Sequence, residues 1–161
     1  MLRGLTLVVS LTTLPMFGST VKLLSSLPNG AFSNAIKLDA QGNIYIAGSL
    51  ANPTAATDAF VAKLSPDGST LTYLTVLSGS SLDAATALTL GTDGSAYVVG
   101  YTSSSDFPVS AGALEPQHDG AEGQMQGFLT KLNPAGSIVY STFINGNAST
   151  KVTGIAVRTA P

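Results

Sequence analysis

The sequence predicts an all-β protein built from repeated four-stranded antiparallel units. Two patterns alternate along the chain, and each returns once: residues 36–48 (IKLDAQGNIYIAG) match 88–100 (LTLGTDGSAYVVG), and residues 60–69 (FVAKLSPDGS) match 128–137 (FLTKLNPAGS). Each pattern places turn-forming residues between two apolar runs, which is the composition of a β-hairpin. Beyond the first 20 residues or so, no amphipathic helical period is present.

The first unit contains two predicted hairpins. In the first turn, Gly42 can take a positive φ and the Asp39 carboxylate can accept hydrogen bonds from the turn backbone. In the second turn, Pro66 presets φ and Gly68 supplies the left-handed position. The strands of this unit are predicted at 35–39, 43–48, 58–64 and 71–77.

The second unit repeats this frame with a longer connection. Residues 101–125 add length between its second and third strands, while proline and glycine keep their offsets at Pro134 and Gly136. Residues 155–157 (IAV) begin the pattern a third time. The strands of the second unit are predicted at 87–91, 95–101, 127–132 and 138–144.

Several of these strands are apolar on both faces, as in 96–99 (AYVV) and 60–62 (FVA). Strands covered on both sides read as continuous apolar runs, and face-to-face stacking of repeated sheets around an axis gives that condition. We therefore predict four-stranded antiparallel β-propeller blades: about two complete blades plus partial flanking strands. The repeat region is 21–161, with blade units at about 34–83 and 84–151 and a third begun at 152.

The chain resembles the bacterial SBBP-type β-propeller repeat family. The resemblance covers roughly residues 34–157 and is carried by segments 39–48 (DAQGNIYIAG), 58–64 (DAFVAKL), 100–108 (GYTSSSDFP) and 139–143 (VYSTF). It implies four-stranded blades and export to the envelope or outside of a bacterial cell, and it brings no catalytic or metal-binding residues. The sequence departs from the pattern where the first unit lacks the Asp-Phe-Pro segment, where Gly91 replaces the equivalent of Asp39, and where 126–127 (QG) replace 58–59 (DA).

The number of units poses a question of closure. Propellers usually contain 4–8 blades, so two units predict either a ring closed by several copies, that is, a homo-oligomer, or a truncated piece of a longer propeller. The solution mass of the purified chain discriminates between these readings.

Composition excludes several classes of function. There is no cysteine, which removes disulfides, thiolate metal sites and a cysteine nucleophile. The net charge is −2 with 10% charged residues, and the seven lysines and arginines are scattered singly, so we expect no nucleic-acid partner. Residues 1–20 have one early cation, Arg3, and a mostly apolar run over 5–17, which predicts a possible signal peptide and a secreted or cell-envelope location, with no integral membrane segment.

No residue set carries recognisable chemistry, so we predict no catalytic, cofactor-binding or metal site. His118 is the single histidine and is expected to be solvated. The loop acids Asp106, Glu115, Asp119 and Glu122 offer oxygen ligands of the kind calcium takes, yet their spacing fits no EF-hand and solvated side chains are the simpler reading. Tyrosines recur at matching positions of the two units and are expected to pack between blades: Tyr45, Tyr73, Tyr97 and Tyr140.

Three functions follow from this reading. The first is a non-enzymatic exported repeat protein that acts as an interaction or surface scaffold and binds protein or carbohydrate through loops at the end of the blades, above all 101–125. The second is a propeller-based enzyme, a lyase or hydrolase, for which metal content and the activity of a His118→Ala variant are the tests. The third is a degenerate fragment without independent function, which poor solubility and a lack of cooperative unfolding would indicate.

Overall fold

The computed structural model describes residues 27–53, 56–121 and 123–158, and within them the protein is all-β without a helix. Eight strands form two four-stranded antiparallel sheets with the simple orders β1-β2-β3-β4 and β5-β6-β7-β8. The strands are β1 (Ala31–Leu38), β2 (Ile44–Ala51), β3 (Thr57–Leu64), β4 (Leu71–Leu77), β5 (Asp83–Leu90), β6 (Ala96–Thr102), β7 (Gln126–Leu132) and β8 (Ile138–Ile144).

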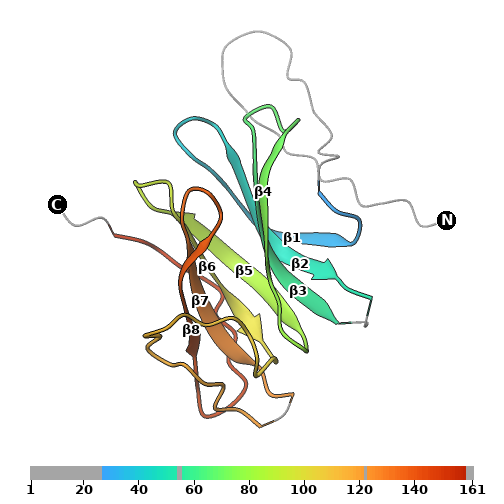
Figure 1. Ribbon diagram of the computed structural model, residues 1–161, viewed down its shortest axis with the longest axis vertical. Helices are drawn as coiled ribbons and strands as arrows, with labels where there is room; N and C mark the ends of the chain where they lie inside the picture. Colours follow the sequence, from blue (N-terminus) through green and yellow to red (C-terminus); the bar gives the residue numbers. More distant parts are fainter. Residues whose placement is uncertain (1–26, 54–55, 122, 159–161) are drawn as a thin grey trace.

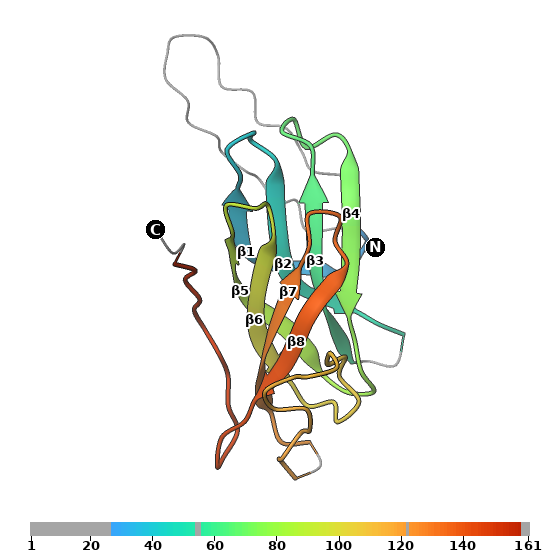
Figure 2. The same ribbon diagram turned by 60° about the vertical axis from the view of Figure 1, so that its left-hand side comes forward.

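The two sheets stack face to face (Figures 1 and 2). Strand β5 lies against β1, β2 and β3 of the first sheet. Because each sheet is a meander, the four hairpin turns gather at one end, and the connections β2–β3, β4–β5 and β6–β7 gather at the other (Figure 2). We call these the turn end and the loop end.

All eight predicted strands are present, but β1 and β5 begin four residues earlier than predicted. Both strands contain a bulge, at Asn34 in β1 and at Thr86 in β5, where the pairing register shifts. A bulge inserts one residue and interrupts the alternation of side chains, so the sequence pattern shows only the part of each strand that follows it.

The repeated glycines Gly48 and Gly100 are explained by the bulges. A Cβ atom built on Gly48 would lie 1.9 Å from the carbonyl oxygen of Phe32, and one on Gly100 would lie 2.0 Å from that of Ala84. These distances are far below van der Waals contact, so no other residue fits beside either bulge without a shift of the backbone.

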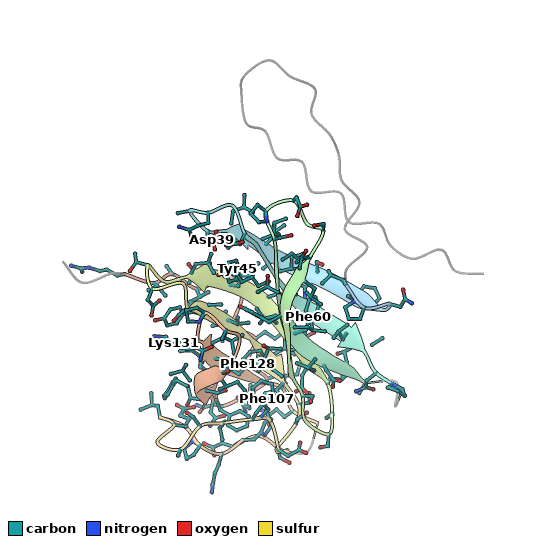
Figure 3. The ribbon with its side chains drawn as sticks, turned by 45° about the horizontal axis from the view of Figure 1, so that its top comes forward. Asp39, Tyr45, Phe60, Phe107, Phe128 and Lys131 are labelled. Atoms are coloured by element: carbon teal, nitrogen blue, oxygen red, sulfur yellow. The ribbon has the colours of Figure 1, made fainter. Side chains whose placement is uncertain are left out.

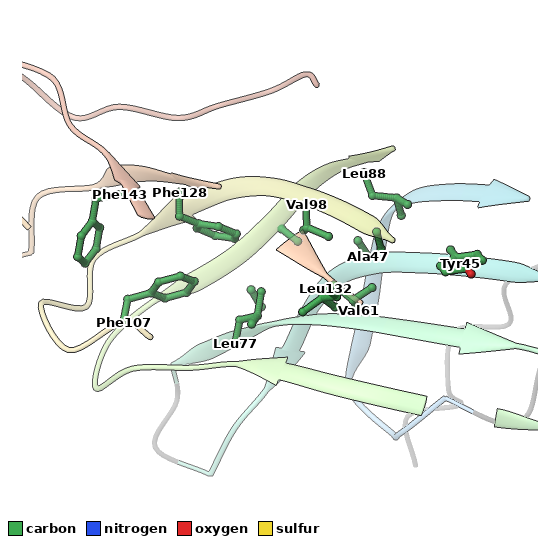
Figure 4. Packing of buried hydrophobic residues seen from close by; sticks show 13 residues of the cluster. Tyr45, Ala47, Val61, Leu77, Leu88, Val98, Phe107, Phe128, Leu132 and Phe143 are labelled. Carbon is green, nitrogen blue, oxygen red and sulfur yellow. The ribbon is translucent and has the colours of Figure 1, made fainter. Parts of the chain in front are cut away.

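The main hydrophobic core lies between the two sheets (Figure 4). The first sheet contributes residues such as Tyr45 and Val61, the second contributes residues such as Val98 and Phe128, and Tyr73 packs against the cluster from β4. The opposite face of the first sheet carries a separate buried cluster around Ile46 and Phe60 (Figure 3). The central strands β2 and β3 are therefore buried on both faces, as their continuous apolar runs predict, whereas the edge strands β1 and β4 remain partly exposed.

The first turn of each unit uses a carboxylate from a different position. In the first unit Asp39 accepts hydrogen bonds from the backbone of Gln41 and Asn43 and lies 3.9 Å from the Lys63 ammonium, which confirms the predicted turn. Gly42 has φ +82°, also as predicted. Burial alone would raise the pKa of Asp39, but these hydrogen bonds, that of the Asn43 side chain and the charge of Lys63 lower it overall.

The second unit replaces Asp39 with Gly91 and compensates two residues later. Asp93 accepts hydrogen bonds from the backbone and hydroxyl of Ser95, and its carboxylate lies 3.6 Å from Lys131. Lys63 and Lys131 occupy the same position in their units, and each ammonium also lies over a tyrosine ring, of Tyr45 and Tyr97. The ion pair is thus kept although the aspartate has moved.

Residues 150–158 follow β8 and lie on the far face of the second sheet (Figure 2). The beginning of this segment contacts the second sheet at the position where β5 contacts the first sheet. The Asn34 amide donates to the carbonyl of Ala85 over 2.8 Å, and the hydroxyl of Thr86, which stands at the same position as Asn34, donates to the carbonyl of Val152. The residues before them also correspond: Thr57 Oγ1 donates to Asp83 O, and Thr150 N donates to Met125 O.

The remainder of this segment alternates like a strand. Ile155 and Val157 are half-buried, whereas Ala156 and Arg158 are exposed. Residues 153–158 make no backbone hydrogen bond to other described residues. Residues 150–152 therefore have the place of the start of β5, and among the described residues no further strand pairs with the segment that follows them.

Candidate functional site

The main difference between the two units is the connection between their second and third strands. Residues 52–56 make this connection in the first unit, and residues 103–125 make it in the second. The long connection lies at the loop end of the molecule, next to the segment that joins the two sheets (Figure 2). It is the region that the sequence analysis selects for binding.

The first half of this loop belongs to the fold. Phe107 is only 2% exposed (Figures 3 and 4). The centroid of its ring lies 4.5 Å from the ring centroid of Phe128 and 6.2 Å from that of Phe143. The loop then runs along the free edge of β8, where Ser110 N donates to Ser141 O and Phe143 N donates to Glu115 O. Deleting 104–124 would remove these core and edge contacts, so a binding test must change a smaller part of the loop.

The segment between β4 and β5 is held by three successive backbone N–H groups. Gly79 N donates to Asp83 Oδ2 over 2.7 Å, Ser80 N to Asp106 Oδ1 over 2.8 Å, and Ser81 N to Ser104 Oγ over 2.9 Å. A Cβ atom on Gly79 would lie 2.3 Å from the Cβ of Ser104, so this approach requires glycine. The turn and the loop are consequently locked together.

The two aspartates that hold this segment have opposite electrostatic environments. Asp83 is fully buried, and burial raises the pKa of its carboxyl, although hydrogen bonds from Thr102, Gly79 and Ser104 lower it. The neighbouring Asp58 adds to the increase. Asp106 is at the surface, and its hydrogen bonds from the backbone and the hydroxyl of Ser80 lower its pKa. Asp106 is therefore an anion at neutral pH.

A cavity of about 500 Å³ opens between the locked segment and the second half of the loop. This volume is within the range of small-molecule sites. Its lining is polar and has no charged side chain among the described residues: Ser80, Ser81, Ser103, Ser105, His118, Gly120, Ala121 and Gly123. We call this cavity the serine pocket.

His118 is half-buried in the wall of the serine pocket, not solvated as expected. Its ring meets the edge of Phe143 with the centroids 5.6 Å apart. Its Nε2 atom is buried without a hydrogen-bond partner. This nitrogen is enclosed by the protein, so it is unpartnered without being presented to the cavity.

The predicted loop acids do not come together. Asp106 binds Ser80, Glu115 Oε2 accepts from Asn145 N over 2.6 Å, Asp119 is exposed, and Glu122 lies outside the described residues. In the described part of the chain, no group of three or more histidine, aspartate or glutamate side chains is placed to hold a metal ion.

The four repeated tyrosines divide between two environments. Tyr45 and Tyr73 pack between the sheets as expected, with their rings 6.4 Å apart. Tyr97 lies beneath Lys131 on the far face of the second sheet, and the Tyr140 hydroxyl accepts a hydrogen bond from Leu114 N.

The sequence predicts a role for the long loop but not for the second segment that lines the pocket. Ser80 and Ser81 come from a short inter-unit connection that carries no motif, and only the run of serines at 78–81 (SGSS) distinguishes it. A similar run at 103–105 lies directly against it, as the bond from Ser81 N to Ser104 Oγ shows, but nothing in the sequence says that the two runs meet.

Comparison with known proteins assigns no family. A scan against protein-family models finds no match, and a search of curated proteins finds no similar sequence. Over the residues that the structure describes, no helix is long and apolar enough to cross a membrane.

Proposed function

We propose that this protein is a non-enzymatic, exported repeat protein that serves as an interaction scaffold. In this proposal each four-stranded sheet is a blade of a β-propeller of the kind that the SBBP-type resemblance implies, and the loop end of the second blade binds the ligand. The proposal has an architectural part and a binding part, which different observations support.

The observation that carries the proposal is the repeated contact between successive units. The Thr86 hydroxyl donates to the carbonyl of Val152 as the Asn34 amide donates to the carbonyl of Ala85, so the chain at Val152 meets the second sheet where the start of β5 meets the first. An interface that recurs in the same register is what a blade-on-blade array requires. A two-sheet sandwich has no need of a further strand in this position.

The chemistry of the serine pocket supports binding over catalysis. Of the serines that line it, Ser80 gives its hydroxyl to Asp106, and the hydroxyls of Ser81, Ser103 and Ser105 make no hydrogen bond to a described base. A serine nucleophile needs an adjacent base to be activated. Rigid walls with unused hydroxyl groups suit recognition instead.

The architectural part is tested by adding a third unit. A second copy of residues 86–152 is fused directly after Val152, so that Thr86 and its neighbours follow Val152 in the register of the repeat. We expect one cooperative unfolding transition with a larger dependence on denaturant, because a stacked unit buries additional surface. A separate transition for the added unit, or its selective proteolysis, would contradict blade stacking. The solution mass of the natural chain complements this test, since a discrete assembly of about two to four copies would supply the 4–8 blades of a ring.

The export part is tested independently. Residues 1–26, which lie outside the described part of the chain, are fused to a phosphatase that is active only after export. We expect activity that is lost when the apolar run at 5–17 is interrupted by charged residues. Equal activity of the two fusions would refute export through this segment.

A further inference from the structure

The outer edge of β4 is left unprotected among the residues that the structure describes (Figure 2). A strand at a sheet edge presents unpaired backbone groups to other chains, and proteins usually protect it with bulges, charges or a covering segment. The other three edge strands have such protection: bulges interrupt β1 at Asn34 and β5 at Thr86, and the long loop covers β8. The pairing of β4 is irregular only at Thr72, so residues 73–77 form a regular edge that no described segment covers.

A comparison with β8 shows which backbone groups of β4 point outward. The covering loop donates a hydrogen bond to the carbonyl of Ser141 and accepts one from the N–H of Phe143, so these two residues turn their backbone groups away from β7. Leu74 and Val76 hold the equivalent positions in β4. Neither residue makes a backbone hydrogen bond to a described residue outside the sheet, so their outward N–H and C=O groups remain available to a further strand.

The sequence of this edge favours pairing with another strand. Residues 68–82 (GSTLTYLTVLSGSSL) contain no charged residue and no proline. The strand itself is rich in apolar, aromatic and β-branched residues, and Val76 is 41% exposed. An uncharged edge of this composition lacks the features that normally prevent strand addition.

The edge is complementary to itself in the antiparallel direction. With Thr75 opposite Thr75 of a second copy, Leu74 of each copy lies opposite Val76 of the other, and the outward N–H and C=O groups of these residues bond to one another. The same register places Tyr73 opposite Leu77. These are apolar, aromatic–aliphatic and threonine–threonine pairs, which stabilise adjacent strands, and no like charges face each other.

We propose that two copies of the protein associate edge to edge through β4, so that their first sheets form one continuous antiparallel sheet. The two-fold axis passes between the two Thr75 residues. This contact uses the edge of the first sheet, so it is separate from the stacking of sheet faces in the proposed function and does not depend on it.

Sedimentation equilibrium of the full chain over a wide range of concentration tests the association. We expect a reversible monomer–dimer equilibrium. Val76→Lys places a cation opposite Leu74 of the second copy and should raise the dissociation constant by about tenfold or more. Val139→Lys is the matched control, because Val139 is a 54% exposed valine on β8, whose edge the loop already covers; this variant should associate like the natural protein.

The register is tested by disulfide formation, because the natural chain has no cysteine. Opposed residues of a non-hydrogen-bonded antiparallel pair have their Cα atoms about 4.5 Å apart, which a disulfide can bridge. Thr75→Cys should therefore give a covalent dimer under mild oxidation, whereas Thr72→Cys, on the same strand but away from the axis, should not. Circular dichroism should confirm that all the variants fold.

Three results would overturn the inference. They are a chain that stays monomeric at every concentration, an association that Val76→Lys does not weaken, and equal yields of covalent dimer from Thr75→Cys and Thr72→Cys. The second of these results would place the contact between sheet faces instead. The three-unit fusion tests blade stacking within one chain, so the failure of edge pairing leaves the proposed function standing.

Discussion

The two units have one frame and differ in one connection. The register of pairing, the bulges, the glycines beside them and the lysine–aspartate pairs recur in both sheets. The link between second and third strands is short in the first unit and 103–125 in the second, where it plugs the core, covers the edge of β8 and forms the serine pocket. The repeated strands and turns thus form the scaffold. The insertion in the second unit both covers the core and the edge of β8 and forms the candidate site.

The strongest test of this difference is Phe107→Ala. Phe107 is the insertion's contribution to the core, and truncation of a buried phenylalanine costs about 3–5 kcal/mol. Denaturant unfolding should show this loss, while Leu114→Ala in the same loop should change stability by about 0.5 kcal/mol or less. Equal midpoints for the two variants would mean that the insertion is dispensable for the fold.

A second test uses the buried aspartate at the junction of the units. Burial raises the pKa of Asp83 above the ordinary value of an aspartate, so the folded protein disfavours its ionised form. The natural protein should therefore lose stability relative to Asp83→Asn as the pH rises through the folded-state pKa, and regain it below the unfolded value. Urea unfolding of the natural protein and of Asp83→Asn at acidic and at neutral pH measures this. If the difference in stability between the two proteins is the same at both pH values, burial does not raise the pKa of Asp83.

A smaller effect is expected from the two equivalent inter-unit hydrogen bonds. Asn34→Ala removes the bond to Ala85 and should cost about 1 kcal/mol of global stability. Thr86→Val removes the bond to Val152 and should chiefly increase hydrogen exchange at the amides of Thr150 and Val152, which donate backbone hydrogen bonds to Met125 and Gly100. Thr86→Ser, which keeps the hydroxyl, is the control. Unchanged exchange in Thr86→Val would remove the equivalence on which the blade proposal rests.

The smallest effects should come from the turn carboxylates of Asp39, which is half-buried, and Asp93, which is exposed. The pKa values of Asp39 and Asp93 are both lowered, so their stabilising contributions are present above the unfolded value of 3.8 and are lost as the pH falls through the folded values. Asp39→Ala and Asp93→Ala should each reduce this acid dependence. If only one of the two variants does so, Asp93 does not stabilise the second unit as Asp39 stabilises the first.

Local sequence patterns are enough to predict the strands and the turns. Pro66 and Gly68 mark a hairpin, and their return at Pro134 and Gly136 marks a repeat, because turn chemistry and alternation are local properties. The same local reasoning placed the start of β1 and β5 too late, since a bulge breaks the alternation that signals a strand.

The role of the long loop depends on contacts made in the folded chain. Nothing in the sequence indicates that Phe107 is a core residue, that His118 is half-buried or that Ser80 and Ser105 line one cavity. These placements depend on contacts between residues far apart in the chain, which sequence periodicity does not encode. The frame is therefore readable from local patterns, whereas the pocket exists only where the inter-unit connection and the insertion are brought together at the loop end.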